Sequence, residues 1–117
     1  MIRKPVYYVD VLATEFTETG EIITADVTPP QTVLVPPPSR RIDTRGTHLF
    51  SSSTSGEVWA YLPTSNKILA KLYCTRYYNI QLPSVHIPGQ VDEPIMITWD
   101  GLSVGAKIFY VIRYKLI

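Results

Sequence analysis

The strongest local signal in the sequence is residues 57–74, EVWAYLPTSNKILAKLYC, where apolar residues recur at every second position on either side of a turn. Before the turn these are Val58, Ala60 and Leu62, and after it they are Ile68, Ala70, Leu72 and Cys74. A period of two is typical of a β-strand, whose successive side chains point to opposite faces. The four residues between the two runs, Pro63 to Asn66, suit a hairpin loop. We therefore predict an antiparallel hairpin whose alternating apolar residues face a core.

Alternation of the same kind recurs along the rest of the chain. It covers residues 6–13, 21–27, 95–100 and 107–117, with shorter segments at 77–82 and 85–87. Gly20 is placed to form a turn between the first two segments, which we predict to pair, and Asp100-Gly101 predicts another turn. In the last segment, the residues expected on the core face are Ile108, Tyr110, Ile112, Tyr114 and Leu116. No segment has a 3.6-residue period. The prediction is therefore an all-β fold in which residues 1–117 form one antiparallel β-sandwich or jelly-roll-like domain.

Residues 28–46 differ from these strands because they contain five prolines and three arginines. Proline fixes φ and donates no backbone hydrogen bond, which excludes a central strand and favours an extended or edge segment, with residues 33–35 contacting the body. Two roles stay open for the segment: an arm that reaches a neighbouring subunit, or a crossover between the sheets of a sandwich. Residues 51–56, SSSTSG, have small polar side chains with nothing to bury, and we predict a flexible loop.

The composition suits a folded domain, since 45% of the 117 residues are hydrophobic and 18% are charged. Cys74 is the single cysteine, which excludes a disulfide framework. No apolar run reaches the length of about 18 residues that a transmembrane helix needs. Asp10 interrupts the amino-terminal apolar stretch before the core of a secretory signal could form. We expect a soluble protein with no membrane partner.

The charges are distributed unevenly although the net charge is only +1. Residues 5–39 contain five acidic residues and no Lys or Arg, whereas residues 67–117 contain six basic residues and three acidic ones. Such a distribution can steer one copy of a protein towards another. The alternative is an ordinary solvated surface.

The sequence contains no pattern typical of catalysis or of metal binding. His48 and His86 are 38 positions apart and lack the spaced His/Cys clusters that usually supply zinc ligands. The serines of residues 51–55 lack the strand-to-helix elbow of a nucleophile. Cys74 is expected in the core, where a thiol is inert. We predict no catalytic residue, no metal and no cofactor.

Two other kinds of partner fit residues 28–46 less well. Arg40, Arg41 and Arg45, together with the tyrosines, could bind single-stranded nucleic acid, but the nearly neutral chain lacks the basic face of such proteins. An SH3-type Pro-x-x-Pro-x-Arg motif ending at Arg40 would need a proline at position 35, which is Val35. A protein surface remains the favoured partner.

A small β-domain with an extended proline-rich segment and no catalytic pattern favours a structural or assembly role. In size, strand content, extended segment and single cysteine, the chain resembles the small all-β decoration or cement proteins of tailed bacteriophage capsids. The resemblance implies a non-enzymatic protein, made in the host cytoplasm, that binds the capsid exterior as a dimer or trimer and bridges major capsid protein subunits. The residues expected to contact this partner are Pro29, Pro30, Val33, Val35, Pro36, Pro37, Pro38, Arg40, Arg41 and Arg45.

The alternative function is a carbohydrate- or receptor-binding module of a virion or cell surface. Trp59, Trp99 and a tyrosine would then offer ring faces beside polar loops. Burial of one tryptophan in the core would weaken this alternative.

Overall fold

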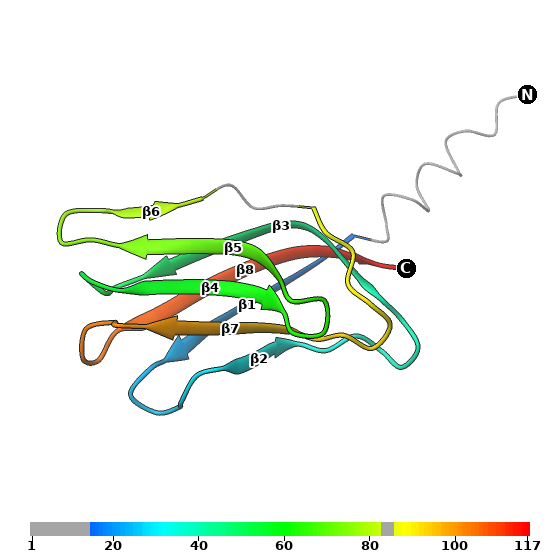
Figure 1. Cartoon of the computed structure of the whole chain (residues 1–117), viewed down its shortest axis with the longest axis horizontal. Helices are drawn as coiled ribbons and strands as arrows, with labels where there is room; N and C mark the ends of the chain where they lie inside the picture. The colour runs from blue at the N-terminus through cyan, green and yellow to red at the C-terminus, as the bar shows by residue number, and fades with distance from the viewer. Residues whose placement is uncertain (1–14, 83–85) are drawn as a thin grey trace, which may run out of the picture.

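A computed structural model describes residues 15–82 and 86–117 (Figure 1). All the regular secondary structure in these ranges consists of β-strands. In chain order they are β1 (Glu15–Ile23), β2 (Gln31–Leu34), β3 (Ile42–Ser51), β4 (Glu57–Leu62), β5 (Lys67–Cys74), β6 (Asn79–Gln81), β7 (Ile95–Asp100) and β8 (Lys107–Leu116). The described residues contain no helix that could cross a membrane.

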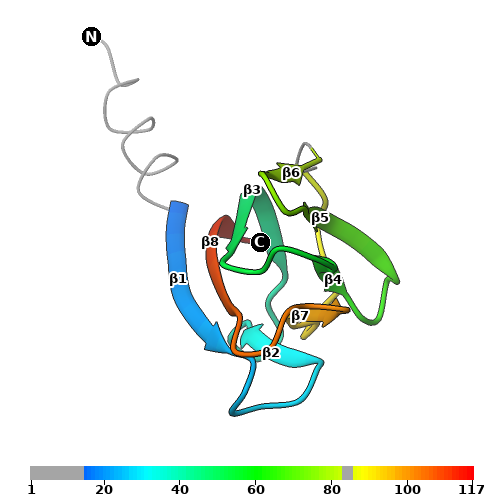
Figure 2. The ribbon, with the colours of Figure 1, turned by 90° about the vertical axis from the view of Figure 1, so that its left-hand side faces the viewer.

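The strands form two antiparallel sheets that pack against each other. The smaller sheet has the order β1-β8-β3, and the larger has the order β2-β7-β4-β5-β6. Viewed end-on in Figure 2, β8 and β3 lie between β1 on one side and the larger sheet on the other. The prediction of an all-β sandwich is therefore confirmed.

One hydrophobic core fills the space between the sheets, as the alternation of apolar residues requires. Its fully buried large side chains include Ile42, Leu49, Val58, Leu62, Leu69, Leu72, Ile95, Ile97, Ile108 and Ile112. The predicted core face of the last strand, β8, is confirmed. Ile108 and Ile112 are buried, and Tyr110, Tyr114 and Leu116 pack against the core. Cys74 is also buried, as expected.

The predicted hairpin is β4 and β5, joined by residues 63–66, but its core face differs at one position. A register shift between Ala60 and Tyr61 leaves one extra residue on β5. Leu69 is therefore buried, and Ile68, expected in the core, is 50% exposed. A bulge changes which face the following residues occupy, and the sequence alternation alone does not reveal it.

The predicted hairpin around Gly20 is wrong for the residues that are described, and residues 6–13 lie outside them. Gly20 is inside β1, which pairs along its whole length with β8, and its cross-strand partner is Tyr110. A Cβ atom at position 20 would be 2.2 Å from the Tyr110 hydroxyl. Glycine is needed here because a ring lies over the strand, not because the chain turns.

The serine-rich loop does bury a residue, contrary to expectation. Ser53 is 3% exposed, and its hydroxyl donates to the Ser55 carbonyl oxygen at 2.6 Å. The Ser53 hydroxyl oxygen in turn accepts hydrogen bonds from the Ser103 backbone N–H and hydroxyl at 2.9 and 3.0 Å. The loop is thus attached to the connection between β7 and β8.

Gln81 of β6 links the edges of the two sheets on one side of the sandwich. Its side-chain amide donates to the Thr47 carbonyl oxygen at 2.8 Å and accepts from the Leu49 N–H at 2.9 Å. The amide therefore satisfies backbone groups of β3 as a neighbouring strand would. Nearby, the Asn79 amide donates to the Ser51 carbonyl oxygen at 2.8 Å.

We expect Gln81→Leu to lower the free energy of unfolding by about 2 kcal/mol, because two partly buried backbone groups lose their partners. Urea unfolding measures the change. Asn79→Ala, which removes one exposed hydrogen bond, is the matched control and should cost less than about 0.5 kcal/mol. Equal losses for the two variants would contradict a closing role for Gln81.

Candidate interaction surfaces

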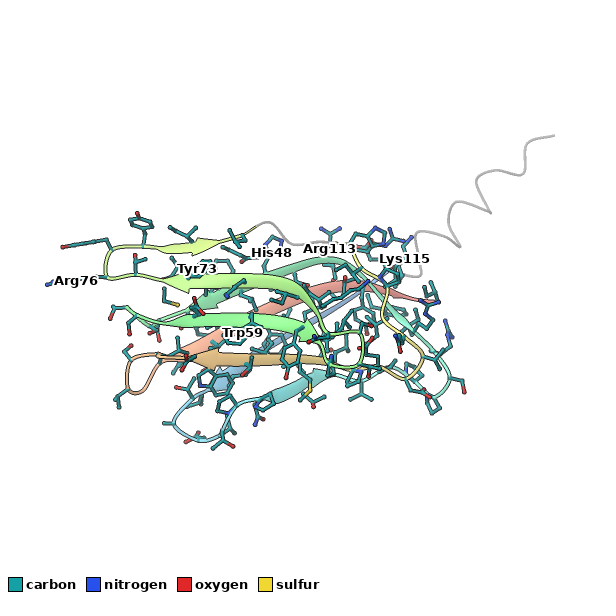
Figure 3. All side chains as sticks on the ribbon, in the orientation of Figure 1. His48, Trp59, Tyr73, Arg76, Arg113 and Lys115 are labelled. Carbon is teal, nitrogen blue, oxygen red and sulfur yellow. The ribbon has the colours of Figure 1, made fainter. Side chains whose placement is uncertain are left out.

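The outer face of the five-stranded sheet is rich in aromatic and large apolar side chains. We call this surface the aromatic face, and its members are Trp59, Tyr61, Ile68, Tyr73, Ile80 and Met96. Most of them alternate with core residues along their own strand, and Ile80 is the cross-strand partner of Tyr73. All of them therefore point away from the core. In Figure 3, Trp59 on β4 and Tyr73 on β5 lie on the sheet that is turned towards the viewer.

A single lysine organises the centre of the aromatic face. The Lys71 ammonium lies 5.3 Å from the centroid of the Trp59 ring and 5.2 Å from that of Tyr73. The same nitrogen is 3.6 Å from a carboxylate oxygen of Glu57. Cation–π contacts and this ion pair hold both rings in place, and the Glu57 carboxylate neutralises the lysine charge. The aromatic face therefore presents rings with no net charge at its centre.

Apart from Trp59, which belongs to the alternative function, the residues of the aromatic face were not predicted to bind a partner, although a signal was present. In residues 57–74, three of the positions that alternate with core residues are aromatic: Trp59, Tyr61 and Tyr73. An outer strand face normally carries polar side chains. A hairpin with aliphatic residues on one face and aromatic residues on the other indicates a second surface that excludes water.

The proline-rich segment lies against its own chain. β2 pairs with β7 as the edge strand of the larger sheet, as expected for residues flanked by prolines, and residues 35–41 then cross to β3 in the smaller sheet. The segment thus serves as a crossover between the sheets, which was one of the two predicted roles. Deleting residues 29–41 would remove β2, so such a deletion does not test partner binding alone.

The predicted partner-binding residues divide into exposed and internal ones. Pro29, Pro30, Val35, Pro37, Pro38, Arg40 and Arg45 are exposed. Pro36 is buried, Val33 packs against the core, and Arg41 is half-buried. The Arg41 Nε atom donates to the Gly89 carbonyl oxygen at 2.7 Å, which gives this arginine a structural role within the chain.

Asp43 is a buried carboxylate between an arginine and a histidine. One of its oxygens is 3.1 Å from Arg45 Nη2, and the other is 2.6 Å from His86 Nε2. Arg45 is therefore a clamp on a carboxylate within its own chain. His48, the other histidine, is exposed on β3. Among the described residues, no three His, Cys, Asp or Glu side chains are grouped as metal ligands would be.

The core thiol has none of the features of a nucleophile. Burial raises the pKa of Cys74, and a hydrogen bond with Ser51 only partly opposes this effect. The thiol therefore stays protonated at neutral pH.

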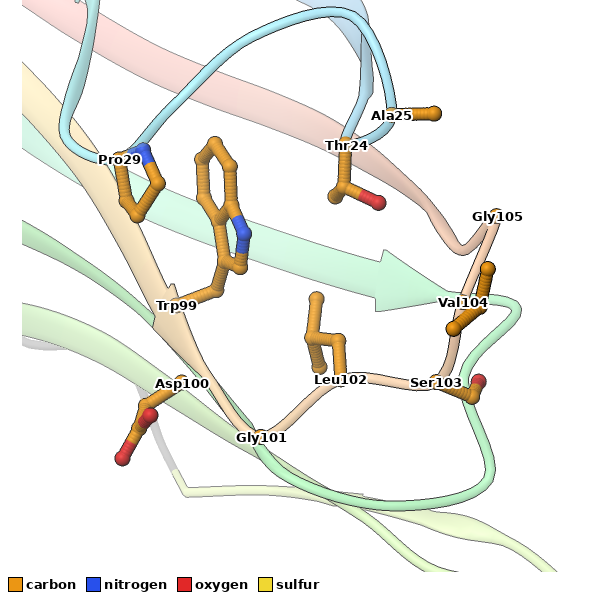
Figure 4. A pocket seen from close by; sticks show the side chains of 10 residues that line it. All are labelled: Thr24, Ala25, Pro29, Trp99, Asp100, Gly101, Leu102, Ser103, Val104 and Gly105. Atoms are coloured by element: carbon orange, nitrogen blue, oxygen red, sulfur yellow. The ribbon is translucent and has the colours of Figure 1, made fainter.

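A pocket of roughly 430 Å³ lies between the β1–β2 and β7–β8 connections (Figure 4). The Trp99 ring forms one wall with Pro29 beside it, and the Asp100 side chain points away from the ring. The Thr24 hydroxyl in the lining donates to the Ala106 carbonyl oxygen at 2.6 Å, and Ser103 bonds to Ser53. The pocket thus offers an apolar ring surface and no charged group directed at it.

No protein-family model matches this sequence, and no curated protein is detectably similar to it.

Proposed function

We propose that this chain is a non-enzymatic assembly protein that binds other protein subunits, and specifically a decoration protein of a bacteriophage capsid. In this role it is made in the host cytoplasm, binds the outside of the shell as a small oligomer and bridges major capsid protein subunits. The observation that carries the proposal is the aromatic face, a broad outer sheet surface with Trp, Tyr and Met side chains around one neutralised charge pair.

This composition is the one that distinguishes the centre of protein interfaces. Aromatic residues and Met are enriched there, and charged residues are depleted. The one charge pair of the aromatic face, Lys71 with Glu57, has no net charge. Trp and Tyr also dominate the energy of binding where they have been tested by substitution. Trp59 and Tyr73 are held by Lys71 before any partner arrives, so little side-chain entropy is lost on binding.

The exposed part of the proline-rich segment extends the same surface. β2 is the edge strand of the sheet that carries the aromatic face, and Pro30 and Val35 flank it. Val35 is 66% exposed. Rigid, extended residues at the border of an aromatic surface add contacts at a small entropic cost.

The proposal predicts that the double variant Trp59→Ser/Tyr73→Ser loses shell binding. Particles from a culture that produces the chain are purified on a density gradient. Mass spectrometry then measures the number of copies of the chain per particle, which should be fixed for the wild type. Two interface aromatics of this kind contribute about 2 kcal/mol each, so we expect at least a 100-fold loss of affinity. The matched control is Val104→Ser, because Val104 is fully exposed on a loop outside the aromatic face.

Thermal unfolding must show that both variants remain folded at the temperature of the binding experiment. Wild-type chain found only in the particle-free fraction would overturn the proposed function. Particle binding that survives loss of both rings would move the binding site elsewhere.

The alternative function, binding of a carbohydrate or receptor, is favoured by the Trp99 pocket. Sugar rings stack on exposed indole faces, and Trp99 forms an open wall beside Pro29. The same ring packs partly against the core, which limits its free surface. Selective glycan-array binding that is lost in Trp99→Ala, but kept in Trp59→Ala, would support this function.

A further inference from the structure

The turn between β5 and β6 is a rigid tip with exposed aromatic rings. We call it the tyrosine tip, and its residues are Thr75, Arg76, Tyr77 and Tyr78. The Thr75 N–H donates to the Tyr78 carbonyl oxygen at 3.1 Å, and the Tyr78 N–H donates to the Thr75 hydroxyl at 3.0 Å. Tyr77 and Tyr78 are 84% and 63% exposed, and Arg76 lies 5.8 Å from the centroid of the Tyr77 ring. Tyr and Arg held on a rigid turn are typical of residues that dominate a binding energy.

The Trp99 pocket lies at the same end of the sandwich as the tyrosine tip, but towards the opposite edge of the larger sheet (Figure 1). The order β2-β7-β4-β5-β6 places the tip at the β6 edge and the β7–β8 and β1–β2 connections towards the β2 edge. Trp99, Pro29 and Leu102 supply apolar lining to the pocket of roughly 430 Å³. Asp100 also belongs to the lining, but it is exposed and its side chain points away from the Trp99 ring (Figure 4). The pocket therefore combines an apolar interior with a carboxylate at its border.

Arg76 of the tip and Asp100 of the pocket are both without an ion pair. The ion pairs within residues 15–82 and 86–117 involve other charged side chains. Residues 51–56 lie between the tip and the pocket at this end and contain no charge (Figure 1). Ser53 of this loop is hydrogen-bonded to Ser103 of the pocket lining. The end of the sandwich thus has a cation and rings on one side, a carboxylate and an apolar pocket on the other, and small neutral residues between them.

From these observations we propose that two copies of this chain dimerise end to end, with the tyrosine tip of each copy in the Trp99 pocket of the other. The two-fold axis passes through this end of the sandwich, perpendicular to the larger sheet. Rotation about it exchanges the β6 and β2 edges, so the tip of one copy faces the pocket of the other. Arg76 then meets Asp100, and Tyr77 meets Trp99. Each contact joins unlike groups and occurs twice, as a two-fold interface requires.

The direction of this axis has a consequence for binding to a shell. A two-fold axis perpendicular to the larger sheet leaves the aromatic faces of both copies on the same side of the dimer. One dimer then presents two aromatic faces to two shell subunits, and the linked contacts bind more tightly than either alone. In this respect the inference rests on the proposed function and deepens it, because it locates the self-association that a bridging oligomer needs.

The area of the contact sets its expected strength. One aromatic side chain buries about 200 Å² of its own surface. Two rings in two pockets bury about 400 Å², and the pocket walls contribute about as much again, which gives roughly 800 Å² in total. A standard stable complex buries about 1,600 Å². We therefore expect a reversible dimer with a dissociation constant on the order of 10 to 100 µM.

The first test is sedimentation velocity of the full chain from 1 to 300 µM. We expect wild type to pass from monomer to dimer, and Tyr77→Ser to show at least a tenfold higher dissociation constant. Val91→Ser is the matched control, because Val91 is also exposed but belongs to the loop before β7, at the opposite end of the sandwich (Figure 1). Its dissociation constant should equal that of wild type. Circular dichroism confirms that the variants are folded.

A charge exchange tests the two-fold pairing itself. In Arg76→Glu alone the tip and the pocket are both acidic, and in Asp100→Lys alone they are both basic, so each variant should dimerise at least tenfold more weakly than wild type. In an equimolar mixture, the acidic tip of the first variant meets the basic pocket of the second, and the unchanged tip of the second meets the unchanged pocket of the first. The mixture should therefore form a heterodimer with an affinity within about threefold of that of wild type.

Several outcomes would overturn the inference: wild type that stays monomeric at 300 µM, a dimer that Tyr77→Ser leaves unchanged, or a mixture that dimerises no better than its components. A glycan that binds the Trp99 pocket of a monomeric chain would assign the pocket to the alternative function instead. A chain that dimerises in this way but does not bind particles would overturn only the proposed function. A chain that binds particles as a monomer would overturn only this inference.

Discussion

Replacing Gly56 with alanine should lower the free energy of unfolding by about 3 kcal/mol, one of the two largest effects on stability expected in this chain. Gly56 has a φ of +88°, which side chains rarely adopt. A Cβ atom there would also be 2.4 Å from the Asp100 carbonyl oxygen and 2.5 Å from the Gly101 carbonyl carbon. These are backbone atoms at the end of the β4–β7 ladder, so they cannot move aside without breaking it.

Gly105→Ala is the control that separates the two causes. Gly105 also has a positive φ, of +76°, but no atom lies within 4 Å of a Cβ built there. Only the conformational cost of about 1 kcal/mol is then expected. Urea unfolding of both variants gives the comparison. A loss at Gly56 no greater than the loss at Gly105 would show that the close approach of the backbones is not the cause.

Strands with an unbroken alternation could be predicted from the sequence. β4, β7 and β8 each place apolar residues at every second position, and the turn residues at 63–66 and 100–101 mark where the chain reverses. Such patterns are reliable because burial of one face is the main source of free energy that fixes the register. Partner strands follow less directly. The pairing of β1 with β8 joins segments from opposite ends of the described chain, and no turn signal announces it.

The strand that the sequence analysis missed, β3, has a broken alternation. Its buried residues include Ile42, Thr44, Thr47 and Leu49, and a register shift between Thr44 and Gly46 changes the spacing from two to three. Two of the four are threonines, which pattern analysis counts as polar. Bulges are tertiary features, and so are buried polar residues such as Thr44, whose hydroxyl donates to the Ile87 carbonyl oxygen at 3.1 Å. Local periodicity cannot encode either of them.

The candidate surfaces could be predicted only in part. Val35 and Arg40 belong to the proline-rich segment that composition singled out, and both are exposed. Arg41 and Arg45 were expected to face a partner, but each is attached to its own chain through Gly89 and Asp43. Residue type indicates that an arginine will bind an acceptor, but the fold determines whether that acceptor is internal.

Replacing Glu93 with alanine is the second change from which we expect a loss of about 3 kcal/mol or more. Glu93 is 1% exposed, and its carboxylate accepts hydrogen bonds from the Ser65 backbone N–H and hydroxyl and from the Gln90 N–H at 2.8 Å. These contacts fasten the β4–β5 turn to the loop before β7. Without the carboxylate, buried donors from both segments lose their acceptor. Thermal or urea unfolding at pH 7 measures the loss, and Asp26→Ala, which removes an exposed carboxylate, is the control.

The same carboxylate should make stability depend on pH in a defined direction. Burial acts to raise the pKa of Glu93, but its hydrogen bonds with Ser65, Gln90 and Thr64 outweigh burial and hold the pKa below the ordinary value of 4.5. A group whose pKa is lower in the folded state stabilises the protein fully above its unfolded pKa and loses that contribution as the pH falls below it. Glu93→Gln keeps the shape but does not titrate. The stability gap between wild type and this variant should therefore shrink from pH 6 to pH 3, and a gap that stays constant would show that the ionised carboxylate does not hold the two segments together.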